Sequence, residues 1–438
     1  MDRTRSLALA ERARRVIPGG VNSSTRNLGA PHAIVGAEGA HVTDADGNRY
    51  LDYHAAFGAM LLGHCEPEIE QAVTEASARF DLSGFGVSEL EVELSEAVVA
   101  EIPSVEQMFT LSSGSEAVAY GLRIARTATD RDLIIKVQGG FHGWSDSVAR
   151  NVISAPDKAF GWDPLGTGMS RTVLEQTLIA EYNDIATVEQ LFADHPEQIA
   201  AVIVEPIPHN VGALLPTDDF LAKLREVTTR EGALLVFDEV ITGFRHALGG
   251  YQSICGVTPD LTTFGKAMGN GRAIAGLGGR LDVMRHADQT QGGTVVVMGT
   301  FNGNQSAAAA ALATIGHLRS NPDFYERTHR LGQRLRAGLN AIFDEAQVAG
   351  VAAGFGGTFS PYFIPGEPTS YRALMANDTA ASLAFNRGLI ERGFLLIPMA
   401  LKRSHISGRH TDADIDATLE AARDVVAEMV AAGTAPRR

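Results

Sequence analysis

Three segments of the chain place chemically capable side chains directly after short apolar runs. Asp238 follows the run Ala233–Phe237, and Lys266 lies among glycines and small residues in the stretch PDLTTFGKAMGNG. The hydroxyl-rich turn Ser113–Ser115 separates the run MFTL from a helical segment. Because open α/β sheets bind ligands beyond the carboxyl ends of their strands, we expect these three segments to meet at one edge of a sheet.

Each segment suggests a different chemistry. A carboxylate that emerges from a buried strand can pair with a cation, although helix capping is a simpler role for it. A lysine among glycines and apolar neighbours is a candidate for a desolvated amine with a lowered pKa, whereas most lysines are solvated. A small hydroxyl-rich turn before a helix exposes backbone N–H groups that can hold a phosphate, and the same turns also serve as ordinary caps. Together, an amine, an acid and a phosphate cradle match the needs of pyridoxal 5′-phosphate, in which a lysine forms the Schiff base and an acid pairs with the pyridinium nitrogen.

Short apolar runs alternate with helical patterns from about residue 65 to 320, and this alternation predicts the elements that position these residues. Such strands, separated by helices, are typical of a mostly parallel sheet that is covered on both faces. The candidate strands are Met108–Leu111, Leu133–Val137, Ala200–Val204, Ala233–Phe237 and Ile274–Gly278. The candidate helices are Ser115–Thr127, Asp184–Asp194, Thr217–Arg230 and Asn304 to about Leu318.

The two ends of the chain have a different pattern. Residues 5–17 predict an amphipathic helix stopped by Pro18-Gly19-Gly20, and residues 40–53 predict a β-hairpin that turns at Asp46-Gly47. Helices alternate with short strands after residue 321. We therefore expect a large α/β domain over residues 61–320 and a small α+β domain over 321–438, with residues 1–60 packing onto the small domain.

Composition narrows the class of protein. The chain has 438 residues, and 37 Lys plus Arg against 52 Asp plus Glu give a formal charge of 37 − 52 = −15. This charge disfavours general binding to nucleic acid or to anionic membranes, because the mean field repels phosphate. Two cysteines cannot build a disulfide framework, and no Cys or His pair has the spacing of a zinc site. No run approaches the roughly 20 apolar residues of a membrane helix. We expect a cytoplasmic protein that binds no metal.

The order of motifs identifies a resemblance. The chain resembles class III aminotransferases of fold type I, in the branch of glutamate-1-semialdehyde aminomutase. The resemblance extends over nearly the full length. It is carried by PGGVNSSTR at 18–26, DADGNRYLDY at 44–53, LGH at 62–64, SSGSEA at 112–117, FHGW at 141–144, VEP at 204–206, FDEVITGF at 237–244, PDLTTFGKAMGNG at 259–271 and GTFNGN at 299–304.

The resemblance implies pyridoxal 5′-phosphate as the cofactor and a role for each matching residue. Lys266 would form the Schiff base and carry the proton, and Asp238 would keep the pyridine nitrogen protonated. The remaining roles concern the binding of the cofactor. Ser113, Gly114 and Ser115 would hold the phosphate, Phe141 would stack on the ring, His142 would position its loop, Glu205 would lie near the phenolic edge, Asn210 would reach the phenolic oxygen, and Thr300 would complete the phosphate site from the other subunit of a homodimer.

Substrate choice is where the chain departs from this branch. Arg26 matches the arginine that grips a substrate carboxylate, a task for which its planar fork is suited. Lys402 stands where the branch has a glutamate, and Phe57 replaces a tryptophan. Because a lysine in place of a glutamate reverses the local charge, we expect a ping-pong aminotransferase that acts on an amino acid, with a β-amino or other non-standard one included, and on a 2-oxo acid. The alternatives are an intramolecular aminomutase of the glutamate-1-semialdehyde type, an amino-acid racemase or epimerase and, remotely, a non-catalytic vitamin-B6-binding protein.

Overall fold

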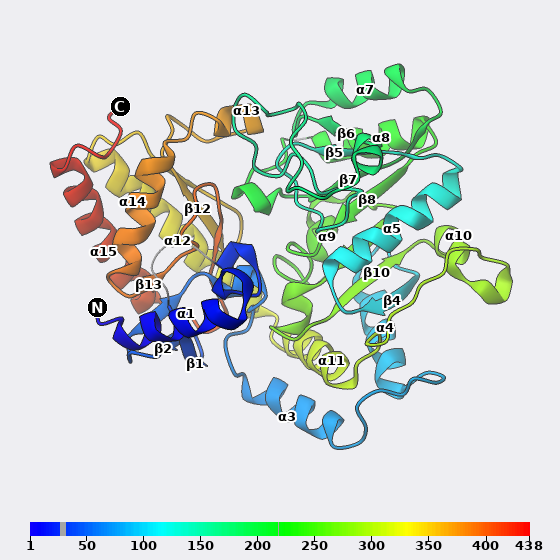
Figure 1. Ribbon diagram of the computed structural model, residues 1–438, viewed down its shortest axis with the longest axis horizontal. Helices are drawn as coiled ribbons and strands as arrows, with labels where there is room; N and C mark the ends of the chain where they lie inside the picture. Colours follow the sequence, from blue (N-terminus) through cyan, green and yellow to red (C-terminus); the bar gives the residue numbers. More distant parts are fainter. Residues whose placement is uncertain (27–31, 218) are drawn as a thin grey trace. The chain divides into compact units, whose positions relative to one another are not determined.

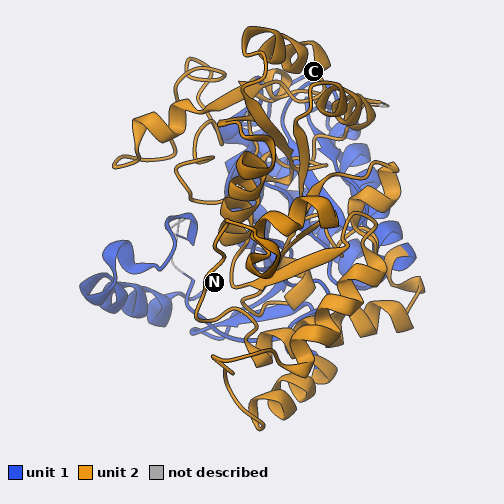
Figure 2. Cartoon of the chain, turned by 90° about the vertical axis from the view of Figure 1, so that its right-hand side faces the viewer, with its two compact units in different colours: residues 1–66, 326–367, 376–438 blue, residues 67–325, 368–375 orange. Residues whose placement is uncertain are grey.

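A computed structural model describes residues 1–26, 32–217 and 219–438 of the chain (Figure 1). The chain divides into two compact units, which Figure 2 shows in different colours. Unit 1 comprises residues 1–66, 326–367 and 376–438, and unit 2 comprises residues 67–325 and 368–375. The domain boundaries expected from the sequence lie after residues 60 and 320. That expectation did not foresee that residues 368–375 belong to unit 2.

Unit 2 is built on a seven-stranded sheet in the order β4-β10-β9-β8-β7-β5-β6. Strand β10 is antiparallel to both of its neighbours, while β9, β8, β7, β5 and β6 are parallel to one another. The strands are β4 (Gln107–Leu111), β5 (Leu133–Val137), β6 (Thr177–Ala180), β7 (Ile199–Val204), β8 (Leu234–Asp238), β9 (Leu261–Phe264) and β10 (Ala275–Gly279). The expected mostly parallel sheet is confirmed.

The list of candidate strands omitted β6 and β9. Strand β9 carries the buried residues Thr262 and Thr263, so its run does not read as apolar. Strand β6 is a four-residue segment with a mixed burial pattern. Pairing with the neighbouring strands of the sheet therefore determines these two strands more than their own sequence pattern does.

The helices of unit 2 pack on this sheet and around it. Helix α5 (Gly114–Thr129) crosses strands β4, β7, β8, β9 and β10, and helix α8 (Phe220–Arg230) packs on β8. The remaining helices are α3 (Pro67–Ser77), α4 (Glu89–Glu101), α6 (Arg171–Glu175), α7 (Ile185–Asp194), α9 (Gly250–Cys255), α10 (Leu281–Met284), α11 (Gln305–Ser320) and α13 (Tyr371–Leu374). The apolar strands and the inner face of α5 form one buried cluster, which gives the carboxyl edge of the sheet a rigid base.

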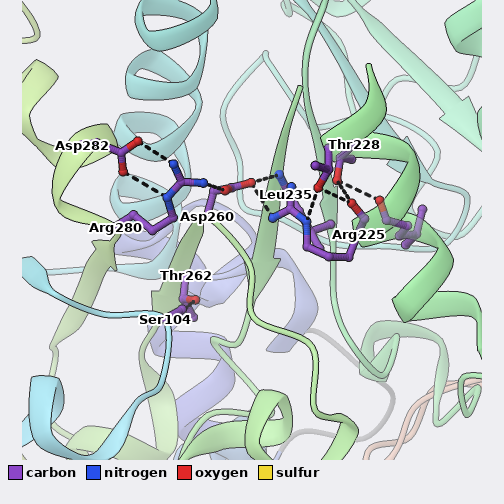
Figure 3. Close-up of polar contacts among 10 residues, drawn as sticks. Ser104, Arg225, Thr228, Leu235, Asp260, Thr262, Arg280 and Asp282 are labelled. Carbon is purple, nitrogen blue, oxygen red and sulfur yellow. Dashed lines mark hydrogen bonds and ion pairs between the residues drawn. The ribbon is translucent and has the colours of Figure 1, made fainter. Parts of the chain in front are cut away.

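The amino edge of the parallel strands is fixed by Asp260, the residue before β9 (Figure 3). Its carboxylate is buried and accepts hydrogen bonds from Arg225 Nη1 at 2.7 Å, Arg280 Nη1 at 2.6 Å and the backbone N–H of Leu235 at 2.7 Å. This single carboxylate therefore ties β8, β9 and the end of β10 together at the edge opposite Asp238.

Unit 1 contains two small sheets and its own helices. The strands β1 (Ile34–Glu38), β2 (His41–Asp44) and β3 (Arg49–Asp52) form an antiparallel meander, onto which β13 (Phe394–Leu395) adds in parallel. The second sheet contains β11 (Val351–Ala353), β12 (Thr358–Tyr362) and β14 (Ser404–His405). The helices are α1 (Thr4–Val16), α2 (Ala55–Gly58), α12 (Asp323–Glu345, of which residues 326–345 belong to this unit), α14 (Thr379–Ile390) and α15 (Asp412–Ala431). Its apolar core draws residues from both ends of the chain.

The hairpin turn between β2 and β3 also caps a helix. The carboxylate of Asp46 accepts hydrogen bonds from the backbone N–H groups of Arg5 at 2.6 Å and Ser6 at 2.9 Å. These groups lie in the first turn of α1, where backbone donors lack partners within the helix. The acidic turn therefore stabilises the amino end of α1.

Within the described ranges, no helix combines the length and the apolar composition needed to cross a membrane. Both cysteines are free thiols. Among the described residues there is no group of three or more His, Cys, Asp or Glu side chains that could hold a metal ion.

Candidate active site

A cavity of about 150 Å³ lies at the carboxyl edge of the sheet in unit 2. Segments that follow β4, β5, β7, β8 and β9 all contribute to its lining, as expected where parallel strands end together. The lining residues are Gly114, Ser115, Phe141, His142, Gly143, Glu205, Asp238, Val240, Ile241 and Lys266. The cavity thus brings together the hydroxyl-rich turn, the acid and the lysine that the sequence singled out.

The acid of the cavity is Asp238, the last residue of β8 and a buried side chain. Its Oδ2 lies 2.7 Å from His142 Nδ1, and its Oδ1 accepts hydrogen bonds from Thr263 Oγ1 and the N–H of Val240, both at 3.1 Å. Because an ionised carboxylate only accepts, His142 donates its Nδ1–H to it. Three donors from three segments therefore fix the orientation of this carboxylate.

The amino end of α5 forms the anion-binding side of the cavity. Ser113 caps the helix by accepting a hydrogen bond from the N–H of Glu116, and the helix dipole adds positive potential at this end. Gly143, whose φ is +99°, packs directly against this turn, because a Cβ built there would lie 2.5 Å from Ser115 Oγ. Glycine at 143 thus lets the backbone of the loop lie against the first turn of α5, where both segments line the cavity.

Lys266 opens the short 3₁₀ turn Lys266–Gly269 directly after β9. Its φ is +43°, a left-handed conformation that costs free energy in any residue with a side chain. Such strain is found most often at functional sites, where the surrounding structure maintains it. Here it places Lys266 in the same cavity as Asp238.

Glu205 and Asn210 hold the loop that carries Phe141 and His142. The two oxygens of Glu205 accept hydrogen bonds from the N–H of Phe141 at 3.0 Å and from the N–H of His209 at 3.1 Å. Asn210 Nδ2 donates to Gly139 O at 2.8 Å, and its side chain is not among those that line the cavity. Both residues are buried, and both contacts restrain the backbone of the loop.

The lining residues fit pyridoxal 5′-phosphate. The cradle at Gly143 and the amino end of α5 suits its phosphate, the carboxylate of Asp238 suits its pyridine nitrogen, and the face of Phe141 suits its ring. Lys266 supplies the primary amine that the cofactor aldehyde requires.

Comparison with known families agrees with this fit. The sequence profile described as Aminotransferase class-III matches residues 23–375 of the chain. The chain belongs to this family. It is therefore a pyridoxal-phosphate-dependent enzyme, and its fold is that of the fold type I enzymes.

Individual members of the family are similar over nearly the whole chain. The glutamate-1-semialdehyde 2,1-aminomutase of Alkaliphilus oremlandii is 40% identical over 97% of this chain and 99% of its own length. The protein of the same name from Laribacter hongkongensis is 41% identical over 98% of this chain and 100% of its own length. An omega-transaminase from Sphaerobacter thermophilus has a similar structure, with a TM-score of 0.90 and 32% identity over 96% of this chain and 97% of its own.

These relatives overturn one expectation from the sequence. The charge reversal at Lys402 and the replacement at Phe57 led to an intermolecular aminotransferase for amino acids as the main prediction. Identity of 40–41% to the two aminomutases, over at least 97% of this chain, favours the intramolecular aminomutase instead. The prediction was wrong because it weighed two departures from the branch, one of them placed by spacing, above similarity along the whole chain.

The residues predicted to bind substrate all belong to unit 1, namely Arg26, Phe57 and Lys402. Arg26 is exposed at the end of a 3₁₀ turn, and Lys402 is half-buried between Leu401 and the buried Arg403. Their part in binding substrate stays a prediction.

Phe57 sits in a strained turn of unit 1. Ala55, Ala56 and Phe57 have φ values of +46°, +49° and +60°, and Gly58 follows at +91°. Three consecutive side-chain-bearing residues in this region are costly, so neighbours must hold the turn. Arg403 Nη2 donates to Phe57 O at 2.7 Å, and His54 Nδ1 accepts from the N–H of Phe57 at 3.2 Å.

Thr300 is exposed, outside the lining of the cavity, in a segment that carries exposed apolar side chains. Val296 is 47%, Met298 72% and Phe301 63% exposed. Tyr120 on α5 anchors this segment, since its hydroxyl donates to Met298 O at 2.7 Å and accepts from Met298 N at 3.2 Å.

Sequence reasoning missed three residues that line the cavity, namely Gly143, Val240 and Ile241. All three lie inside the motifs FHGW and FDEVITGF, so their proximity in sequence to His142 and Asp238 was the available signal. Ser113 is not among the lining residues and caps α5 with its hydroxyl; its part in binding the phosphate stays a prediction.

Proposed function

We propose that this protein is an intramolecular aminomutase of the glutamate-1-semialdehyde type. The observation that carries the proposal is the identity of 40–41% to the two aminomutases over at least 97% of this chain. The substrate class is then a 2-amino aldehyde with a distal carboxylate. Moving the amino group from the second carbon to the first gives an isomeric amino ketone, so no oxo-acid acceptor is consumed.

When bound, pyridoxal phosphate supplies an electron sink for the bond changes at the substrate carbon. In our proposal Lys266 removes and returns the proton at that carbon, a task for a primary amine that is free once substrate is bound. Asp238 keeps the pyridine nitrogen protonated, and His142 holds Asp238 in position through the 2.7 Å contact. Phe141 packs against the ring, and Gly114 and Ser115 hold the phosphate together with the adjoining Ser113. Asn210 stays proposed for the phenolic oxygen and Glu205 for the same edge.

In unit 1, we assign Arg26 to the distal carboxylate of the substrate, because a guanidinium can make two parallel hydrogen bonds to it. Phe57 and Lys402 are proposed to shape the same binding site. Arg26→Ala should raise KM for glutamate-1-semialdehyde strongly with a smaller change in kcat, because the carboxylate is not a reacting group.

The test is isomerisation without an acceptor. Purified protein loaded with pyridoxal phosphate or its amine form is mixed with glutamate-1-semialdehyde alone, and the amino ketone is measured. Catalytic turnover, with many products per active site, supports the proposal. A single turnover that continues only after pyruvate or 2-oxoglutarate is added would refute it, because that result defines a transaminase.

We also propose a homodimer in which Thr300 completes the phosphate site of the other subunit. Support comes from the exposed apolar side chains of Val296, Met298 and Phe301, since clusters of this kind mark interaction surfaces. A folded monomer that keeps full cofactor affinity in dilute solution would contradict this proposal. The cytoplasmic location stays a proposal that rests on composition.

A further inference from the structure

Lys136 is a fully buried lysine next to the cofactor cavity, and none of the roles above uses it. It lies in β5, and its side chain has an exposed fraction of 0%. Its Nζ donates hydrogen bonds to Gly140 O at 2.8 Å, Val148 O at 3.2 Å and Arg150 O at 2.6 Å. Lysine is almost never fully buried unless its charge has partners, and three carbonyls match the three hydrogens of an ammonium group.

The three carbonyls belong to both arms of one loop. The loop leaves β5 after residue 137, carries Phe141, His142 and Gly143 to the cavity, and returns to residue 151. Its base is closed by a hydrogen bond from the N–H of Gly139 to Asn151 O at 2.9 Å. Lys136 therefore holds the outgoing arm at Gly140 and the returning arm at Val148 and Arg150.

Lys136 and Glu205 bind the two ends of the same peptide bond. The carbonyl of Gly140 accepts from Lys136 Nζ at 2.8 Å, and the N–H of Phe141 donates to Glu205 Oε1 at 3.0 Å. This carbonyl and this N–H belong to one planar unit, and each meets a group whose charge favours it. The plane that precedes the Cα of Phe141 is thus fixed from both sides.

Burial opposes the positive charge of the Lys136 amine, and the charge of Glu205 offsets this cost in part. Burial lowers the pKa of the Lys136 amine to about 7, while the opposite charge of Glu205 raises it and Arg150 lowers it. When Lys136 is protonated, both charges favour the peptide bond between them, because its dipole runs from a negative oxygen near the amine to a positive N–H near the carboxylate.

We propose that Lys136 and Glu205 act together as positioning residues that hold the Gly140–Phe141 peptide bond and so set the Phe141 ring against the cofactor. This inference rests on the proposed role of Phe141 in the cofactor site. It does not depend on whether the reaction is isomerisation or transamination, because its test reads cofactor binding and not turnover.

The experiment compares Lys136→Met with Lys158→Met, the same change at an exposed lysine of unit 2. We expect Lys136→Met to raise the dissociation constant of pyridoxal phosphate about tenfold, equal to about 1.4 kcal/mol. The visible circular dichroism per bound cofactor should also fall, because it reports the seating of the ring. Values for Lys136→Met equal to those for Lys158→Met would overturn the proposal.

A double-mutant cycle separates positioning from general stability. If Lys136 acts through Phe141, the tenfold loss should shrink to less than about twofold in a Phe141→Ala background. An undiminished loss in that background would refute the mechanism.

A measurement on the native holoenzyme and on Glu205→Gln covers the case in which Lys136→Met does not fold. Hydrogen exchange at the Phe141 amide should be slow in the native protein and at least about tenfold faster in Glu205→Gln, because that change removes the charge of the acceptor. Fast exchange at this amide in the native protein would show that the peptide bond is not held.

Discussion

Gly143→Ala tests the anion cradle most directly. An added Cβ would lie 2.5 Å from Ser115 Oγ and 2.8 Å from both Ser115 Cα and Cβ. The backbone at 143 has a φ of +99°, which an alanine adopts only with strain. The variant should therefore lose both stability and affinity for the cofactor phosphate.

The two costs can be estimated separately. A side chain in this backbone region costs about 1–3 kcal/mol, and forced overpacking costs about another 1–3 kcal/mol. Gly168→Ala is the matched control, because Gly168 has a φ of +81° but no atom within 4 Å of an added Cβ. The difference between the two variants in free energy of unfolding should therefore be about 1–3 kcal/mol.

The assay is urea unfolding of the cofactor-free variants, followed by titration with pyridoxal phosphate. Ser115→Gly in the Gly143→Ala background removes two of the three close atoms and should recover part of the stability. Equal destabilisation by Gly143→Ala and Gly168→Ala, with unchanged cofactor affinity in both, would refute the steric reasoning.

Three further predictions concern Lys266, the ion pairs of Asp260 and two histidines. Lys266→Ala should lower isomerisation at least about 10²–10⁴-fold, measured as product per unit time, while cofactor still binds through the phosphate cradle. Asp260→Asn removes a buried charge and should lower the free energy of unfolding, measured in urea, by about 2 kcal/mol; the cost stays at this size because Arg225 and Arg280 are partly exposed and can rehydrate. The control Asp282→Asn, at a side chain that is 55% exposed, should cost less than about 1 kcal/mol. Burial lowers the pKa of His54 and His410 from 6.5 to about 4, so between pH 4 and 6.5 the unfolded chain binds more protons than the folded chain. The free energy of unfolding should therefore fall as the pH drops from about 6.5 to 4. His410→Gln should make the free energy of unfolding depend less on pH in this range.

Much of the fold and of the cavity could be predicted because the strands of unit 2 are short apolar runs with chemistry at their carboxyl ends. Asp238 follows such a run, Lys266 lies among glycines after the less apolar β9, and the structure places both in one cavity. The hydrogen-bond partners of Glu239 could not be read from its neighbours in the sequence. It is buried, accepts hydrogen bonds from the N–H groups of Tyr251 and Gln252, and has its pKa raised by burial. Those partners come from α9, beyond the reach of any local pattern.

Lys136 shows the same limit more sharply. In the run LIIKV a single lysine reads as one polar position in a strand, with nothing to indicate a charge at 0% exposure. Its acceptors lie 4, 12 and 14 residues further along the chain, and their carbonyls carry no information in the sequence of side chains. The strained turn at Phe57 could not be predicted either, because two alanines and a phenylalanine give no local reason for positive φ.

The return of residues 368–375 to unit 2 has a consequence for the order of folding. Tyr371 contributes to unit 2 through two hydrogen bonds with the backbone of Ser154, at 2.7 and 2.9 Å, and its N–H donates to Glu181. The chain is synthesised from its amino end, so unit 2 lacks this piece until 375 of 438 residues have been made. Strand β3 gains its parallel partner later still, because β13 begins at Phe394. Neither unit can complete its structure early during translation, and contacts so distant in sequence favour slow folding through intermediates with exposed apolar surface.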